Sequence, residues 1–236
     1  MVLSIRLSPR RGSLPPAWRE VLPEVKEEEG SSEEALLERL ADGAVDAVLV
    51  AARPGSPAAR AAEGRGLAVG AVPLRPEPRD VLVALDEGAT LATLPDGARV
   101  ALAGARRRAL LAAHRPELEA VDLPARGAGA VAAFLRGGGA DAAVLAAHVA
   151  RAAGLSHAAS EVLQPKAWLP GPGQGASVLL VRAGDEESRE ALAPLHHAPT
   201  QAALEAEAAL RRALGLGADA PLGALALPYG RWLRLW

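Results

Sequence analysis

Cysteine and asparagine are both absent from the 236 residues of the chain, and lysine occurs only at Lys26 and Lys166. The lack of cysteine excludes disulfides, thiolate nucleophiles, zinc–thiolate sites and any cofactor held through a thioether. A shortage of heat-labile side chains together with proline-rich loops is typical of thermophilic proteins, although a GC-rich genome produces much of the same bias.

Long hydrophobic runs, strong net charge and aromatic side chains are also scarce. No apolar stretch reaches the ~18 residues that span a bilayer, and residues 1–6 start in a strand-like segment without the hydrophobic region of a signal peptide. We therefore expect a soluble cytoplasmic protein without a membrane partner. A net charge of −2, with one Phe and one Tyr, provides neither a basic surface nor a stacking platform for nucleic acid.

Half of the residues are hydrophobic, and short apolar runs alternate with amphipathic stretches. This alternation predicts an α/β fold with doubly wound, parallel sheets. The run Ser31-Ser32-Glu33-Glu34 marks one helix start, because serine caps and acids in the first turn complement the free N–H groups and the helix dipole. The predicted strands span residues 3–7, 45–51, 67–74, 81–84, 98–103, 118–123, 140–145 and 177–182, with two short strands around 222–227 and 231–235. The predicted helices span residues 15–25, 35–41, 106–113, 128–135, 146–153 and 201–214.

A glycine-rich loop at residues 169–176 leads directly into the predicted strand 177–182. Its glycines and prolines require a tight turn with room at its surface. No Gly-Lys-Ser/Thr follows, so the loop is not a P-loop. By itself it fits a tight turn without a ligand as well as it fits a binding loop.

Several motifs keep their order over nearly the whole chain and together resemble one family. They are Arg11-Gly12-Ser13 followed by Trp18, Pro78-Arg79-Asp80, residues 97–100 with Arg106-Arg107-Arg108, Arg115-Pro116-Glu117, residues 141–146, residues 169–176, and residues 214–217 followed by 221–224. This collinear set is similar to the hydroxymethylbilane synthases, also called porphobilinogen deaminases. The resemblance implies a reaction that joins four porphobilinogen units, with release of ammonia, on a dipyrromethane primer bound to a cysteine.

The resemblance also implies two domains like those of periplasmic binding proteins, a cleft between them and a small third domain. We expect domain 1 at residues 1–77 and 172–186, domain 2 at residues 78–171, and a truncated α+β domain 3 at residues 187–236. The proline-rich and charged segment 75–80 then forms the first crossing between domains.

Two departures from the family concern its chemistry. Ala218 stands where the family has the cofactor cysteine, and an alanine methyl group cannot form a thioether. Pro54 stands where the family has the aspartate that transfers protons, and proline cannot act as a general acid. We therefore expect no bound dipyrromethane, no catalytic residue and no transferase activity from this chain.

Basic residues are retained more fully. Arg106 and Arg107 start a predicted helix after a strand, where free N–H groups favour anions. The candidate ligand-binding residues are Arg106, Arg107, Arg11, Ser13, Arg53, Arg126, Gly173 and Gln174. We expect them to bind an acidic pyrrole-type or other anionic ligand in the interdomain cleft. The plainer explanation is that arginine is the usual surface cation of this chain.

Two other interpretations stay open. The chain can be a non-catalytic partner of another tetrapyrrole enzyme. Alternatively, Gly127, Gly129 and Ala132 fit the Gly-x-Gly-x-x-Ala fingerprint of dinucleotide-binding proteins, although the next acid, Asp141, comes too early and inside the next predicted strand. The five histidines lack metal-ligand spacing, so we expect no metal. The oligomeric state does not follow from the sequence.

Overall fold

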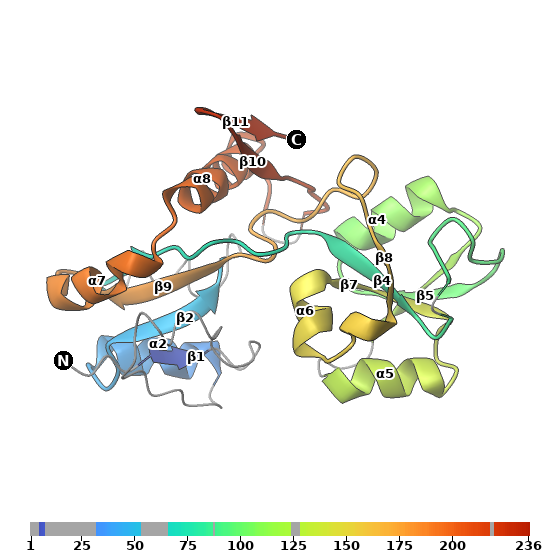
Figure 1. The fold of residues 1–236 in the computed structure, drawn as a ribbon, viewed down its shortest axis with the longest axis horizontal. Helices are drawn as coiled ribbons and strands as arrows, with labels where there is room; N and C mark the ends of the chain where they lie inside the picture. The colour runs from blue at the N-terminus through green and yellow to red at the C-terminus, as the bar shows by residue number, and fades with distance from the viewer. Residues whose placement is uncertain (1–4, 8–31, 53–65, 87, 124–127, 218–219) are drawn as a thin grey trace. The chain divides into compact units, whose positions relative to one another are not determined.

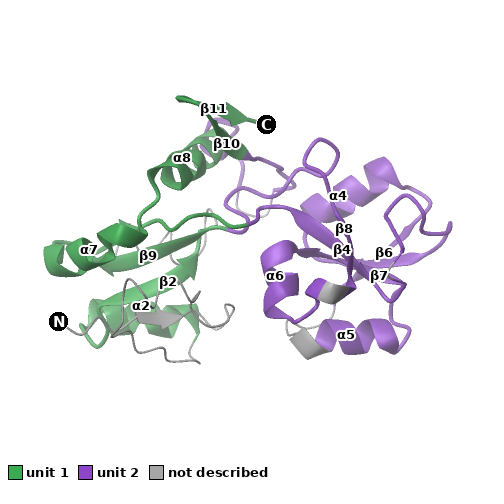
Figure 2. Ribbon diagram, in the orientation of Figure 1, with its two compact units in different colours: residues 1–76, 176–210, 226–235 green, residues 77–175, 211–225, 236 purple. Residues whose placement is uncertain are grey.

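The computed structural model describes residues 5–7, 32–52, 66–86, 88–123, 128–217 and 220–236 (Figure 1). The chain divides into two compact units, which Figure 2 shows in different colours. Unit 1 combines the described parts of residues 1–76 with residues 176–210 and 226–235. Unit 2 combines the described parts of residues 77–175 and 211–225 with residue 236. The three-domain boundaries expected from the sequence stay a prediction.

Unit 1 contains a four-stranded sheet in the order β1-β2-β9-β3. Its strands are β1 (Ile5–Leu7), β2 (Ala47–Ala51), β9 (Ser177–Arg182) and β3 (Leu67–Ala71). β1 runs parallel to β2, whereas β9 runs antiparallel to both β2 and β3. The alternation of side chains along β2 then supplies one apolar set to each face of the sheet.

Helix α2 (Glu33–Ala41) covers one face of this sheet. Its N-cap is Ser32, whose hydroxyl accepts a hydrogen bond from Ala35 N at 3.2 Å, so the predicted helix start is confirmed. Leu36 of α2 packs with Val48 of β2. On the opposite face, Leu192 of α7 (Glu186–Leu192) and the short helix η2 (Ala193–Leu195) pack against Leu49.

The C-terminal region contains helix α8 (Ala198–Ala213) and a hairpin of β10 (Ala226–Tyr229) and β11 (Trp232–Leu235). A buried ion pair joins Arg75 Nη1 to Glu207 Oε1 of α8 at 2.7 Å. The same carboxylate oxygen accepts a hydrogen bond from Ala226 N at 2.8 Å. One buried acid therefore fixes α8 to the segment after β3 and to the start of the hairpin.

Unit 2 contains a five-stranded sheet in the order β6-β5-β7-β4-β8. Its strands are β6 (Glu119–Asp122), β5 (Arg99–Leu102), β7 (Ala142–Ala146), β4 (Asp80–Ala84) and β8 (Ala159–Val162). Helix α4 (Ala105–His114) packs Leu111 onto one face, together with the buried side chain of Trp168. Helix α5 (Ala128–Arg136) and helix α6 (Ala147–Ala152), which is followed by the short helix η1 (Ser156–Ala158), pack onto the other.

The α/β class expected from the sequence is confirmed, but the sheets are mixed and not wholly parallel. The parallel arrangement holds for β1 with β2 and for β6, β5 and β7. It is wrong for β4 and β9. Ser177 starts β9 beside Ala51 at the end of β2, and Asp80 starts β4 beside Ala146 at the end of β7. Both strands enter their sheets at the carboxyl edge without a crossover helix. They therefore run antiparallel to the strands beside them.

Three smaller expectations also change. Residues 222–225 form no strand, and β10 begins at Ala226. Helix α7 lies in a charged segment outside the helices predicted above, and α8 begins at Ala198 instead of residue 201. No helix in the described part of the chain is long and apolar enough to cross a membrane.

Candidate functional site

The most polar cluster in the interior of unit 2 surrounds the carboxylate of Asp80, the first residue of β4. Its side chain is fully buried and accepts four hydrogen bonds. Arg106 Nη2 and Trp168 Nε1 donate to Oδ2 at 2.7 and 3.0 Å. Arg107 Nη2 and Gln174 Nε2 donate to Oδ1 at 2.7 and 2.9 Å. The cluster therefore draws on a strand, a helix and the glycine-rich loop.

The antiparallel direction of β4 explains why these groups meet. Asp80 pairs with Ala146, so it lies at the carboxyl edge of the parallel strands β5 and β7. Helix α4 starts at this edge after β5, with Gly104 as its N-cap at a φ of 87°. Arg106 and Arg107 lie in the first turn of α4, and open α/β sheets bind ligands at this edge.

The two arginines differ in how many of their donors are used within the protein. Arg106 Nη1 donates to Leu169 O at 2.6 Å, and its Nη2 is shared between Asp80 and Gln174 Oε1. Arg107 donates strongly only to Asp80, since its second bond, from Nη1 to Ala103 O, measures 3.3 Å. One hydrogen on each of its Nη atoms is not used by these two bonds. Arg107 is therefore the guanidinium with spare donors.

Gln174 and Gly175 bring the glycine-rich loop to the cluster. Gln174 Nε2 also donates to Pro78 O at 2.7 Å, which joins the loop to the segment before β4. Gly175 has a φ of 80°, and a Cβ atom there would lie 2.3 Å from the carbonyl oxygen of Glu77. Only glycine allows this backbone conformation and this close approach together. Gly175 thus has a packing role beside any role of the loop in binding.

The electrostatics of the cluster leave it cationic. Burial alone would raise the pKa of Asp80, but the neighbouring guanidiniums of Arg107 and Arg106 outweigh this effect and lower the pKa below its ordinary value. Burial lowers the pKa of Arg106, although the charge of Asp80 acts to raise it. A guanidinium nevertheless stays protonated in proteins. Two guanidinium charges and one carboxylate charge therefore give the group a net charge of +1.

The structure brings together three of the residues predicted from the sequence as ligand-binding: Arg106, Arg107 and Gln174. Gly173 lies in the same loop with a φ of 72°. The remaining predicted site residues, Arg11, Ser13, Arg53 and Arg126, lie outside the described residues, as do Pro54 and Ala218. Their roles stay predictions.

Asp80 and Trp168 belong to the cluster but were not predicted as site residues. A lone acid at the start of the apolar run Val81-Leu82-Val83 was the available signal, because a buried charge needs partners. Trp168 gave no such signal, since a tryptophan before a loop is as readily a core residue. It is in fact 2% exposed and packs in the core as well as donating to Asp80.

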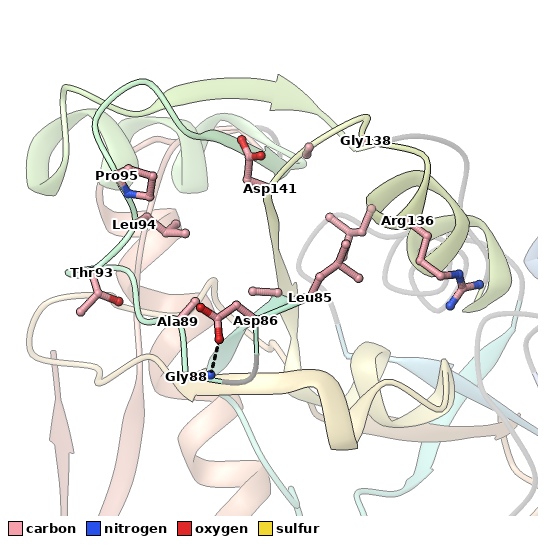
Figure 3. Close-up of a pocket in the computed structure, with 13 residues that line it drawn as sticks. Leu85, Asp86, Gly88, Ala89, Thr93, Leu94, Pro95, Arg136, Gly138 and Asp141 are labelled. Carbon is pink, nitrogen blue, oxygen red and sulfur yellow. Dashed lines mark hydrogen bonds between the residues drawn. The ribbon is translucent and has the colours of Figure 1, made fainter.

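An open hollow of about 650 Å³ lies at the opposite edge of the same sheet (Figure 3). It is lined by Ala84 at the end of β4 and by Asp141 just before β7. Asp141 accepts a hydrogen bond from Arg99 N at 2.7 Å, and Asp86 accepts one from Gly88 N at 3.0 Å. Both acids are exposed, and their carboxylates accept hydrogen bonds from backbone N–H groups. We therefore place the candidate site at the Asp80 cluster.

Neither a metal site nor the dinucleotide-binding fingerprint finds support in the described residues. No group of three or more His, Cys, Asp or Glu side chains there could hold a metal ion. Asp141 precedes β7 at its amino end, whereas a dinucleotide site needs its acid near the carboxyl end of a strand. Gly127, the first glycine of the fingerprint, lies outside the described residues.

Comparison with solved structures supports the fold. The chain is similar to a periplasmic substrate-binding protein of an ABC transporter from Coxiella burnetii, with a TM-score of 0.51, 18% identity and coverage of 83% of this chain and 92% of that one. A nutrient binding protein from Burkholderia cenocepacia bound to methionine gives a TM-score of 0.52 at 17% identity, covering 81% and 90%. At these identities the likeness establishes a periplasmic-binding-protein-like fold and nothing about ligands.

Comparison with sequences establishes the family. Residues 24–190 match the family described as porphobilinogen deaminase, dipyromethane cofactor binding domain. The porphobilinogen deaminase of Roseiflexus castenholzii is 43% identical over 164 residues, covering 70% of this chain and 54% of the relative. That of Thermus thermophilus is 42% identical over 162 residues, covering 69% and 53%. The chain thus spans about half the length of the curated relatives it matches, and it belongs to the porphobilinogen deaminase family of tetrapyrrole biosynthesis.

Proposed function

We propose that this chain is a non-catalytic member of the family that binds an acidic pyrrole-type ligand through the Asp80 cluster. The observation that carries the proposal is the pairing of a net charge of +1 with the Nη hydrogens of Arg107 that are not used within the cluster, at the carboxyl edge of the sheet. Pyrrole intermediates of this pathway carry several carboxylates, and a guanidinium binds carboxylates through short, charge-assisted hydrogen bonds.

The covalent cofactor of the family does not fit this chain. Attachment of dipyrromethane needs a thiolate, and the chain has no cysteine at any position. The donors gathered around Asp80 are guanidinium, indole and amide N–H groups, which can bind an anion but cannot form a thioether. We therefore propose a ligand held without a covalent bond.

The chemistry of Asp80, the acid at the centre of the described cluster, supports the non-catalytic part of the proposal. Asp80 is the buried acid of the cluster, but its lowered pKa keeps it ionised at neutral pH. Each of its oxygens already accepts two hydrogen bonds. A general acid needs a pKa near the working pH and access to the substrate. Asp80 meets neither requirement, so it positions the arginines and does not replace the aspartate whose place Pro54 occupies.

The experiment is a titration with uroporphyrin I, a fluorescent tetrapyrrole with eight carboxylates, followed by fluorescence or calorimetry. A charge-assisted hydrogen bond contributes roughly 1.5–3 kcal/mol, so Arg107→Ala should weaken binding by about 10- to 100-fold. Arg108→Ala is the matched control, because Arg108 is the next residue of α4 and pairs with the exposed Asp122. Arg189→Ala, at an exposed ion pair on α7, is a second control.

Equal affinities of Arg107→Ala and the controls would refute the role of Arg107. No detectable binding by the parent protein would refute the ligand, and a non-catalytic partner of another tetrapyrrole enzyme would become the better explanation.

A further inference from the structure

Amide side chains are rare in this chain. Asparagine is absent, and glutamine occurs only at Gln164, Gln174 and Gln201. The side chains of Gln164 and Gln201 make their hydrogen bonds at exposed positions. The side-chain hydrogen bonds of Gln174 lie within the Asp80 cluster and are partly buried. One neutral amide is thus built into a cluster whose proposed role in binding depends on charge.

The backbone on both sides of Gln174 constrains where its side chain lies. Gly173 and Gly175 have φ values of 72° and 80°, which glycine adopts without strain. Gln174 N donates to Gly171 O at 2.9 Å, which closes a turn in the glycine-rich loop. The close approach of Gly175 to the carbonyl of Glu77 holds this turn against the segment before β4. The loop therefore presents the amide to the cluster from a constrained backbone.

The amide group supplies both an acceptor and a donor to the cluster. Its Oε1 accepts a hydrogen bond from Arg106 Nη2 at 3.0 Å, and its Nε2 donates one to Asp80 Oδ1 at 2.9 Å. A carboxylate could make the first contact but not the second, and an ammonium group could make the second but not the first. Glutamine thus joins a cation to an anion and leaves the net charge of the cluster at +1.

The contact with Oδ1 also limits how Asp80 can bind Arg107. A carboxylate oxygen accepts about two hydrogen bonds, and Oδ1 receives one from Gln174 and one from Arg107 Nη2 at 2.7 Å. Oδ2 likewise accepts two, from Arg106 and Trp168. No acceptor site of Asp80 is therefore left for a second donor of Arg107.

We propose that Gln174 is a positioning residue, which keeps the unused Nη hydrogens of Arg107 available for a ligand because it occupies Asp80 Oδ1. Without the amide, Oδ1 could accept a second hydrogen bond from Arg107, and the two side chains would form the bidentate pair that arginine and carboxylate favour. A guanidinium held in this way has fewer donors to offer. This role rests on the ligand binding proposed above for the same cluster.

The test is a double-mutant cycle on the full chain, with uroporphyrin I as the probe and fluorescence as the readout. Gln174→Met has a similar length and leaves the net charge unchanged, but it removes both amide contacts. We expect it to weaken binding by no more than the about 10- to 100-fold expected for Arg107→Ala, because it acts through Arg107. In the Arg107→Ala background the same change should cost less than about 2-fold, since the guanidinium that Gln174 positions is gone.

A merely structural role predicts a different result. If Gln174 served only to hold the glycine-rich loop, the two losses would be independent and would multiply in the double variant. Gln174→Ala repeats the cycle with a shorter side chain, so that the result does not depend on how methionine packs, and urea unfolding checks that each variant is folded. Gln164→Met is the matched control: Gln164 belongs to the same unit and donates to Val162 O at 3.1 Å, but at an exposed position. It should change the affinity by less than about 2-fold.

The outcomes separate this role from the ligand proposal. A loss of affinity that disappears in the Arg107→Ala background is the result we expect. Losses that multiply, or affinities of Gln174→Met and Gln174→Ala equal to that of the parent, would overturn the positioning role and leave the ligand proposal standing. Absence of binding by the parent would overturn both together.

Discussion

Removal of the Asp80 charge should be among the most damaging single changes in unit 2. Asp80→Asn keeps the size of the side chain but replaces one acceptor oxygen with an NH₂ group. Oδ1 and Oδ2 each accept two hydrogen bonds in the native protein, so the new NH₂ group would face two N–H donors. The guanidiniums of Arg106 and Arg107, whose side chains are only 11% and 16% exposed, would lose their counter-charge.

The magnitude follows from this burial. Breaking a buried ion pair by removing one partner costs about 3–5 kcal/mol, because an uncompensated charge stays in the interior. Asp122→Asn is the matched control. It breaks the ion pair between Asp122 and Arg108, which lies in α4 like Arg106 and Arg107, but Asp122 is 93% exposed. An exposed pair contributes only about 0–1 kcal/mol. Urea unfolding at pH 7, followed by circular dichroism, measures both changes in the free energy of unfolding.

The pH dependence adds a second criterion. The pKa of Asp80 is lower in the folded protein than its ordinary value of 3.8, so its contribution to stability is present above pH 3.8 and is lost as the pH falls through the folded pKa. The difference between the native protein and Asp80→Asn should therefore shrink as the solution is acidified below that value. A loss below about 1 kcal/mol at pH 7, or a difference that stays constant on acidification, would refute this interpretation of the cluster.

Two further predictions concern the departure from the family and the glycine-rich loop. Ala218→Cys alone should not produce hydroxymethylbilane from porphobilinogen, because Pro54 fixes its backbone and cannot transfer a proton; measurable production by this single variant would show that another carboxylate acts as the acid. Gly175→Ala should lower the free energy of unfolding by clearly more than Gly138→Ala. Both residues have a positive φ, which costs a non-glycine residue about 1–2 kcal/mol, but only at Gly175 would the new Cβ meet backbone, at the carbonyl of Glu77. Equal losses in urea unfolding would contradict the close approach.

Local signals in the sequence predicted much of the fold. Ser32 and the acids after it marked the start of α2 correctly, since a cap is a short-range interaction. The apolar run at residues 45–51 correctly indicated a buried strand, because β2 contributes to the core on both faces of its sheet. Arg106 and Arg107 were expected at a helix start, and α4 begins one residue before them.

The direction of β4 could not be predicted in the same way, and this explains why Asp80 was missed. A parallel β4 would place its first residue at the amino edge of the sheet, away from the start of α4. The observed antiparallel strand places Asp80 beside Ala146 at the carboxyl edge, within reach of both arginines. Strand direction depends on where a connection without a helix enters the sheet, and no short sequence pattern encodes that choice.

The most direct test of the proposed non-covalent, non-catalytic role is the intact mass of the purified chain after incubation with porphobilinogen, measured under denaturing conditions. We predict a single species at the sequence mass of 24.2 kDa, because no residue of the chain can hold a dipyrromethane through a thioether. A species heavier by one or more pyrrole units would contradict the proposal and would show that the chain carries and extends a covalent primer.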